Sequence, residues 1–178
     1  MARPTASFLK VIGLLGIFTL APASLYIMYT RTGGPGSPKE MGFQKNLRYA
    51  LMAGGHALDL APLTAWPWIK ACALDSAVSA ADVEAVVGFR YENYAQLHWL
   101  PRADHWTLLF IDSEREASWG LARPITPVRI PRKELANLAL PAGAKGACID
   151  HGQTIQISRG DAPVGVSPVT LEFQGEGP

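Results

Sequence analysis

The chain has no marked excess of charge of either sign. Its sixteen lysine and arginine residues nearly balance fifteen aspartate and glutamate residues, which gives a formal net charge of +1 at pH 7. A protein that binds nucleic acid or an anionic surface through electrostatics usually carries a basic patch or stripe. The near-balance of charge therefore gives no indication of either kind of partner.

The sequence also lacks the common signatures of catalysis, cofactor binding and metal binding. It contains no G-x-S-x-G serine elbow, no P-loop and no G-x-G-x-x-G dinucleotide fingerprint, the motifs that mark those sites. Its four histidines are scattered, without C-x-x-C, H-x-x-x-H or H-E-x-x-H spacing, so metal ligands are not expected to converge. We predict no catalytic residue, no cofactor and no metal.

Cysteine is scarce, because Cys72 and Cys148 are the only two in the chain. Two cysteines in a domain outside the cytoplasm suggest one disulfide, whereas distant cysteines in a cytosolic domain are more often unpaired buried thiols. We predict a disulfide between Cys72 and Cys148. Two unpaired core cysteines are the alternative.

A long uncharged run is the most informative feature that is present. Residues 11–30 contain no charged side chain, and a helix of this length spans roughly 30 Å, about the thickness of the hydrocarbon core of a bilayer. We predict a membrane-spanning helix over 11–30, preceded by a short basic tail over 1–10. The alternatives are a signal peptide cleaved after Ala23 and a buried helix of a soluble protein. Against cleavage, apolar residues continue past Ala23 to Tyr29, where signal peptides normally become polar.

The charges that flank this run do not decide its orientation. Arg3 and Lys10 precede it and several basic residues follow it, so the positive-inside rule is nearly balanced. The short leader resembles that of a signal anchor, and the predicted disulfide favours an oxidising compartment such as the periplasm. We therefore predict a single-pass protein of the cell membrane whose C-terminal domain lies outside the cytoplasm.

The remainder of the chain is expected to form a linker and one domain. Glycine and proline concentrate within 31–40, a composition typical of linkers. We place the domain at 41–174 and a C-terminal tail at 175–178. Its patterns predict an α+β fold, with a mainly antiparallel sheet of about five or six strands and two or three short helices.

Helices are predicted at three places in this domain. Within 39–60, apolar residues recur at the i, i+4, i+7 and i+8 positions of one helical face. Ser79 and Asp82 form a capping-box pattern before a short helix at 80–87, with a glycine directly after it. A third helix is predicted at 131–138, where a proline would occupy the first turn.

Strands are predicted from runs of apolar and aromatic residues. A hairpin is expected from 94–100 and 105–112, and its second strand should be central because it is apolar on both faces. A second hairpin is expected from 147–150 and 154–158. The remaining strands are a buried one at 68–74, short edge pieces at 119–122 and 128–130, and a final one at 169–173.

Tryptophan provides the main candidate for an interaction site. Five tryptophans exceed what one small core usually needs, and tryptophan supplies large, stiff contact area at interfaces. We predict that Trp66 and Trp68 form an exposed platform for a protein partner, with Arg129 and Arg132 as basic residues that grip its acidic groups. The alternative is that these rings fill the core and the arginines form a solvated basic face.

Two acid–imidazole pairs, Asp104-His105 and Asp150-His151, are the candidates for catalysis. Neighbours in a strand point to opposite faces, so sequential pairs are poorly placed to act together. We therefore predict a non-catalytic accessory or assembly subunit of an envelope complex, whose partners are the membrane and another protein rather than nucleic acid. The alternatives are an envelope hydrolase that uses one of these pairs, and a small secreted inhibitor or immunity-type protein.

Overall fold

The computed structural model describes residues 36–90, 102–112, 125–159 and 169–173. Every described residue belongs to the unit Gly33–Pro178. The predicted membrane helix at 11–30 and the predicted strands at 94–100 and 119–122 lie outside the described residues. Within the described part, no helix has both the length and the apolarity needed to cross a bilayer.

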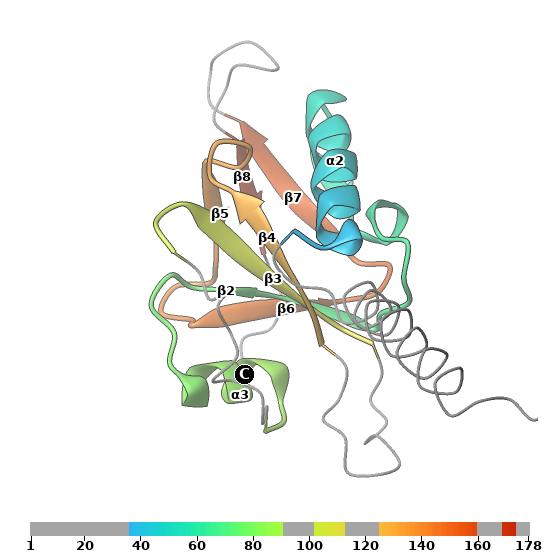
Figure 1. Ribbon diagram of the computed structural model, residues 1–178. Helices are drawn as coiled ribbons and strands as arrows, with labels where there is room; N and C mark the ends of the chain where they lie inside the picture. The colour runs from blue at the N-terminus through green and yellow to red at the C-terminus, as the bar shows by residue number, and fades with distance from the viewer. Residues whose placement is uncertain (1–35, 91–101, 113–124, 160–168, 174–178) are drawn as a thin grey trace, which may run out of the picture. The chain divides into compact units, whose positions relative to one another are not determined.

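The described residues form an α+β fold of two four-stranded sheets and two α-helices (Figure 1). Sheet A consists, in spatial order, of β1 (Ala57–Asp59), β7 (Thr154–Arg159), β8 (Val169–Glu172) and β5 (Asn137–Ala139). Sheet B consists of β4 (Ile125–Pro131), β3 (His105–Ile111), β2 (Lys70–Leu74) and β6 (Gly146–Asp150). The helices are α2 (Pro38–Met52), α3 (Ala80–Val87) and the short 3₁₀ helix η1 (Ala61–Leu63).

The predicted fold class is confirmed in outline. Neighbouring strands pair antiparallel in both sheets, except for the parallel pair β5 and β8. The number of strands was underestimated, because eight described strands form two sheets where a single sheet of five or six was expected.

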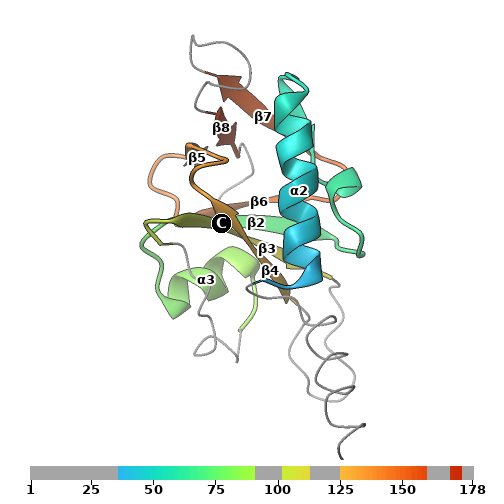
Figure 2. The ribbon, with the colours of Figure 1, turned by 45° about the horizontal axis from the view of Figure 1, so that its top comes forward.

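The centre of sheet B is the most deeply buried part of the domain. All seven residues of β3 are buried, and β3 lies between β4 and β2. Because side chains alternate between faces along a strand, Trp106, Leu108 and Phe110 join the larger core with sheet A and α2, whereas Leu109 and Ile111 join a second core beneath α3. Figures 1 and 2 show α2 and α3 on opposite sides of sheet B. The prediction that this strand is central and covered on both faces is confirmed.

Helix α3 follows the predicted capping pattern. The Ser79 hydroxyl accepts a hydrogen bond from the Asp82 backbone N–H at 3.2 Å, and the Asp82 carboxylate accepts one from the Ser79 N–H at 2.7 Å. This reciprocal arrangement satisfies two N–H groups that a helix start otherwise leaves unpaired. Gly88 ends the helix with a φ of 80°, a left-handed conformation that favours glycine. The three valines of α3 are buried against sheet B.

Helix α2 begins within the range that was assigned to the linker. Ser37 is its N-cap, with the hydroxyl accepting from the Glu40 N–H at 3.2 Å, and Pro38 occupies the first turn. Serine followed by proline is a helix-start signature, which explains why this proline does not extend a linker. The buried face of α2 has the predicted apolar spacing, except that it also contains the carboxylate of Glu40, which is 2% exposed.

Glu40 is held by Arg129 of β4. Its carboxylate accepts hydrogen bonds from the Arg129 backbone N–H at 2.9 Å, from Nε at 2.8 Å and from Nη2 at 3.0 Å. The Gly36 N–H also donates to it. One turn along α2, Gln44 Nε2 donates to the Arg129 carbonyl at 2.6 Å. Side chains of α2 therefore bond both backbone groups of Arg129.

This contact closes the outer edge of sheet B. Along an antiparallel strand, the backbone N–H and C=O groups of successive residues alternate between bonding the neighbouring strand and pointing away from it. The hydrogen bond from the Arg132 N–H to the Asp104 carbonyl shows which residues of β4 bond β3. The backbone groups of Pro127, Arg129 and Pro131 consequently point away from β3. The prolines have no N–H, and Arg129 is bonded to α2, so the edge between Pro127 and Pro131 offers no unbonded N–H to another strand. The predicted edge strand at this position is confirmed.

The cysteines are joined as predicted. Cys72 of β2 and Cys148 of β6 form a disulfide, and they lie directly opposite each other in the ladder with Cα atoms 4.0 Å apart. The backbone bond from His151 to Ile69 places the cysteines at a non-hydrogen-bonded position, where paired Cα atoms approach most closely. Cys72 is fully buried in the core beneath α3.

Two predictions of local structure were wrong. The predicted helix at 131–138 is the end of β4, a turn and then β5; Pro131 lies at an outward strand position, where its missing N–H costs nothing. The predicted hairpin of 147–150 and 154–158 does not form, because β6 pairs in sheet B and β7 in sheet A. The turn at His151-Gly152 carries the chain from one sheet to the other.

We expect Glu40→Ala to destabilise the domain by about 2–4 kcal/mol, because it leaves the Arg129 guanidinium and an outward N–H of β4 without their partner. Urea unfolding followed by tryptophan fluorescence measures the change. Glu84→Ala on α3 is the control, since substitution of a surface carboxylate usually changes stability by less than about 0.5 kcal/mol. Equal losses of stability in the two variants would contradict the structural role assigned to the Glu40–Arg129 contact.

The Glu40 contribution should depend on pH. Burial raises the pKa of the Glu40 carboxyl group, but hydrogen bonds from Arg129 and Gly36 and the attraction of the guanidinium outweigh burial, so the pKa lies below its ordinary value of 4.5. The contribution is therefore fully present above about pH 4.5 and is lost as the pH falls through the pKa of the folded state. We expect the stability difference between the wild type and Glu40→Ala to shrink on acidification, which urea unfolding at a series of pH values measures.

Removal of the disulfide should destabilise the domain through the unfolded state. The two cysteines are 76 residues apart, and a cross-link over such a loop stabilises by about 3–4 kcal/mol. We expect that loss for the double substitution Cys72→Ala and Cys148→Ala, measured by urea unfolding. Reduction of the wild type by a thiol reagent separates loss of the cross-link from loss of sulfur packing, and an unchanged unfolding midpoint after reduction would refute the prediction.

Candidate functional site

The predicted tryptophan platform is part of the core. Trp68 is 4% exposed, and its Nε1 donates to Thr64 Oγ1 at 2.9 Å. Trp66 is half-buried, and both rings pack edge-on against Phe110 of β3, with centroid distances of 5.6 Å for Trp66 and 5.4 Å for Trp68. Lys39 lies over Trp66, 5.6 Å from its ring centroid. These rings therefore do not form an exposed platform. They belong to the core, as the alternative interpretation expected.

The two predicted interface arginines are also engaged inside the domain. Arg129 is bonded to Glu40, as described above. The guanidinium of Arg132 lies over the ring of Trp106, with its carbon 3.7 Å from the centroid, and its Nε donates to the Arg102 carbonyl at 3.2 Å. Stacking of a guanidinium on an indole is a favourable cation–π contact. Both arginines thus have structural roles that require no partner.

The structure brings one acid–imidazole pair together. Asp104 Oδ1 lies 2.8 Å from His105 Nδ1, although a sequential pair was expected to point to opposite faces. Asp104 lies in the turn that precedes β3, so strand alternation does not apply to it. The hydrogen bond with His105 lowers the pKa of the Asp104 carboxyl group. In the other pair, the His151 ring packs against Trp68 with ring centroids 4.6 Å apart and the ring planes tilted by 56°.

The Asp104–His105 pair alone does not define an active site. General base catalysis needs an imidazole that reaches the reacting group, with a nucleophile or water within hydrogen-bond distance. Here the carboxylate faces solvent and the imidazole does not, since their side chains are 82% and 7% exposed. Among the described residues, no group of three His, Cys, Asp or Glu side chains is placed to hold a metal ion.

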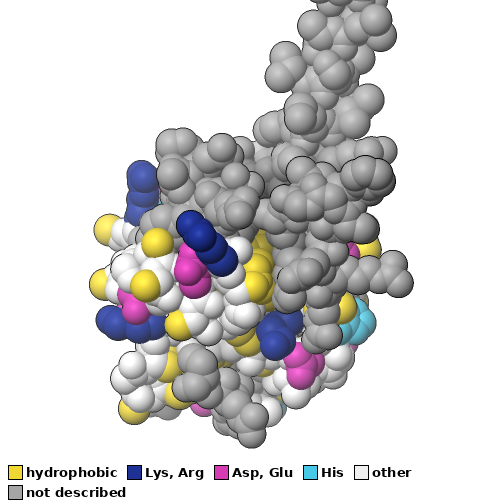
Figure 3. Space-filling model, turned by 90° about the horizontal axis from the view of Figure 1, so that it is seen from below, with side chains coloured by type: hydrophobic (Ala, Val, Ile, Leu, Met, Phe, Trp, Pro, Cys, Tyr) yellow, Lys and Arg dark blue, Asp and Glu magenta, His cyan; other side chains and the backbone are white. Residues whose placement is uncertain are grey.

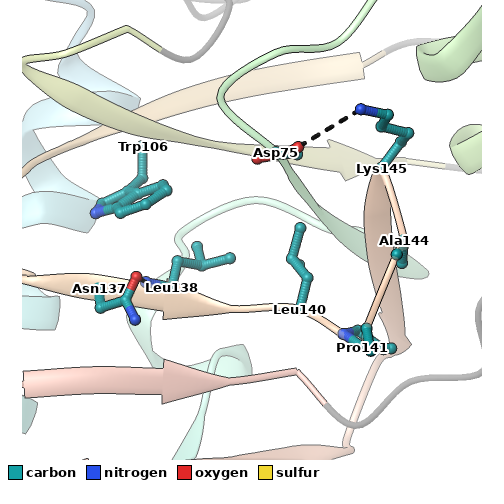
Figure 4. A pocket seen from close by; sticks show the side chains of 10 residues that line it. Asp75, Trp106, Asn137, Leu138, Leu140, Pro141, Ala144 and Lys145 are labelled. Carbon is teal, nitrogen blue, oxygen red and sulfur yellow. Dashed lines mark hydrogen bonds and ion pairs between the residues drawn. The ribbon is translucent and has the colours of Figure 1, made fainter.

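An open groove of about 380 Å³ lies between the end of β5 and sheet B (Figure 4). Leu138 and Leu140 line it, with the Trp106 ring at one end and an ion pair of 3.9 Å between Asp75 and Lys145 at the other. The Trp106 Nε1 is already bonded to a backbone carbonyl. The polar side chains of its lining already have partners within the domain, because Asp75 pairs with Lys145 and the Asn137 Oδ1 accepts a hydrogen bond from the Leu138 N–H at 2.9 Å.

The outer face of α2 carries the large exposed apolar side chains of the described residues. Met41, Tyr49 and Met52 are 56%, 62% and 60% exposed. With 3.6 residues per turn, these three positions and the exposed Lys45 and Arg48 form one stripe, which we call the outer face of α2. This stripe lies opposite the buried face of the helix. On the face of the molecule shown in Figure 3, described hydrophobic side chains are instead interspersed with acidic and basic ones.

This face was not predicted from the sequence, because the predicted apolar spacing covers only the side of α2 that faces the core. The signal was present, since two methionines and a tyrosine occupy positions of the same helix that should be polar. Comparison with protein-family models, curated proteins and solved structures found no match for the chain. The geometry of its own residues therefore decides the candidate site, and it favours the outer face of α2 over the groove and the acid–imidazole pair.

The groove residues should affect stability rather than binding. We expect Trp106→Phe to destabilise the domain by about 1–2 kcal/mol, because the hydrogen bond to the Leu135 carbonyl is lost and the Arg132 stacking surface shrinks. Lys145→Ala should change stability by less than about 0.5 kcal/mol, because its ion pair with Asp75 is largely exposed. Urea unfolding measures both changes. A larger effect of Lys145→Ala would contradict the prediction that its ion pair contributes little to stability.

Proposed function

We propose that this protein is a single-pass membrane protein whose domain outside the cytoplasm binds another protein, as a non-catalytic accessory or assembly subunit. The observation that carries the proposal is the stripe of Met41, Tyr49 and Met52 on the outer face of α2, each more than half exposed. Single exposed hydrophobic residues are normal on a protein surface, but an apolar cluster on one face is typical of an interaction site.

The composition of this face is that of a protein interface. Methionine adapts its shape to a partner, and tyrosine supplies rigid contact area. Lys45 and Arg48 add charge beside these side chains, as in the polar rim around an apolar interface centre. Arg48 also forms an ion pair with Glu134 in the turn before β5, which holds one side of this rim in place.

Helix α2 presents the face on a fixed support. At its start, Glu40 is bonded to Arg129 of β4. At its end, Arg159 of β7 donates from Nη2 to the Leu51 carbonyl at 2.7 Å, which places a positive charge at the negative end of the helix dipole. A surface that is ordered before binding loses less conformational entropy in the complex.

The membrane part of the proposal is supported by the sequence. The uncharged run at 11–30 precedes α2 by only a few residues, so α2 is the first described element after the proposed anchor. The disulfide between Cys72 and Cys148 is consistent with an oxidising compartment. Together these features support a tethered domain outside the cytoplasm.

A second candidate function is an envelope hydrolase, favoured by the 2.8 Å contact between Asp104 and His105. The exposure of the two groups makes it the weaker candidate. A catalytic imidazole must reach its substrate, whereas here the carboxylate is the exposed member of the pair.

We expect the double substitution Met41→Glu and Met52→Glu to reduce co-purifying partner protein at least roughly tenfold, because two carboxylates would replace apolar contact area at the centre of an interface. The full chain is extracted in detergent, affinity-purified and analysed by quantitative mass spectrometry. Recovery of peptides from residues 1–23 also tests whether the N-terminal segment is cleaved.

The matched control is Ala81→Glu with Ala85→Glu, which adds the same charge at exposed positions of α3. Thermal melting should show that both double variants remain folded. Partner recovery that is equal in the two variants would refute the assignment of the outer face of α2.

A further inference from the structure

Gly42 lies on the exposed side of α2, between Met41 and the later residues of the outer face. Its backbone is helical, and a Cβ atom added at this position would meet no atom within 4 Å. Glycine within an exposed helix is destabilising relative to alanine, because it loses more conformational freedom on folding. The described fold therefore gives no reason for a glycine at this position.

Two other glycines of the domain do have a structural reason to be glycine. A Cβ at Gly146 would lie 2.6 Å from the Ala73 carbonyl oxygen and within 3 Å of the Val86 side chain, so the packing of α3 on β6 requires glycine there. Gly88 has a positive φ at the end of α3. Gly42 has neither a close contact nor a positive φ.

A glycine on a helix surface allows another backbone to approach closely. The distance between packed helices depends on the side chains at their contact, and glycine permits the shortest approach. At Gly42 the missing side chain leaves a notch beside Met41 and Lys45, with Tyr49 two turns further along. A helix that crosses α2 at this notch would contact these larger side chains on both sides.

The charge of the face indicates what kind of helix fits. Lys45 is exposed, Arg48 is already paired with Glu134 of the same domain, and the sole acidic residue of α2, Glu40, is buried against β4. Packing of α2 against α2 of a second copy would bring like charges together, which is unfavourable. Carboxylates on a partner helix would instead complement this face.

We propose that the outer face of α2 binds an acidic amphipathic helix of another protein, which crosses α2 at Gly42 and places a carboxylate against Lys45. Binding of an amphipathic helix through its apolar face is an established mode of recognition. The inference rests on the proposed protein-binding function and goes beyond it by naming the chemistry of the partner and the point of closest approach.

The first test is photo-crosslinking from this face. A photoreactive phenylalanine analogue replaces Tyr49 in the full chain in its native membrane, and mass spectrometry sequences the attached segment. We expect a helix-forming segment of another protein with net negative charge. An adduct with lipid, with a second copy or with residues 11–30 of this chain would overturn the inference, as would the absence of any adduct.

The second test uses Gly42→Ala with the crosslinked segment as a synthetic peptide. We expect the thermal midpoint to rise by about 3–6 °C, because alanine favours the helix. Affinity for the peptide should fall roughly tenfold, because the new methyl group occupies the contact. Gly55→Ala is the control, since a Cβ there makes only an ordinary 3.6 Å contact outside the outer face, and it should leave affinity unchanged.

The outcomes separate this inference from the proposed function. A lower thermal midpoint or unchanged affinity for Gly42→Ala would overturn the close approach at Gly42. The protein-binding function would still stand if Met41→Glu with Met52→Glu released the partner. If those substitutions released nothing, the proposed function itself would fail.

Discussion

The buried ion pair between Glu40 and Arg129 determines how α2 attaches to the rest of the domain. A carboxylate removed from water is unfavourable unless its charge and lone pairs are satisfied. Here three N–H groups of Arg129 and one of Gly36 satisfy it, while Gln44 bonds the Arg129 carbonyl. These bonds require one alignment of α2 along β4, because a shift by one helical turn would leave the buried charge without its partner.

This attachment also determines which surfaces remain open to a partner. Exposed strand edges are common sites for pairing with another chain, but α2 and two prolines close the outer edge of β4. Arg159 fixes the other end of α2, so the inner face and both ends of the helix are engaged within the domain. The outer face of α2 takes no part in the bonds to Arg129 and Arg159, so a partner bound there would leave them intact.

The features predicted correctly from sequence were those encoded by local patterns. The cap of α3 depends on Ser79 and Asp82, and the central position of β3 follows from apolar residues on both faces. The pairing of strands is not local, because β6 and β7 follow each other closely in the sequence and yet belong to different sheets. The burial of Glu40 could not be predicted from the sequence either. An acid in the first turn of a helix normally faces solvent and complements the helix dipole, and only the fold shows that this one is buried.

The same distinction applies to Trp66 and Trp68, which were expected to be exposed. Tryptophan is favoured both in cores and at interfaces, so the composition could not decide between these two locations. In the fold, Trp66 and Trp68 both pack against Phe110 of the core. A residue that breaks a local rule without a structural compensation is more informative. Sequences usually agree with their fold at every level, and departures from that agreement concentrate at functional sites. Gly42 is such a departure in a helix that is otherwise strongly fixed, since neither a close contact nor a positive φ requires glycine there, and this departure is the basis of the proposed close approach of a partner helix.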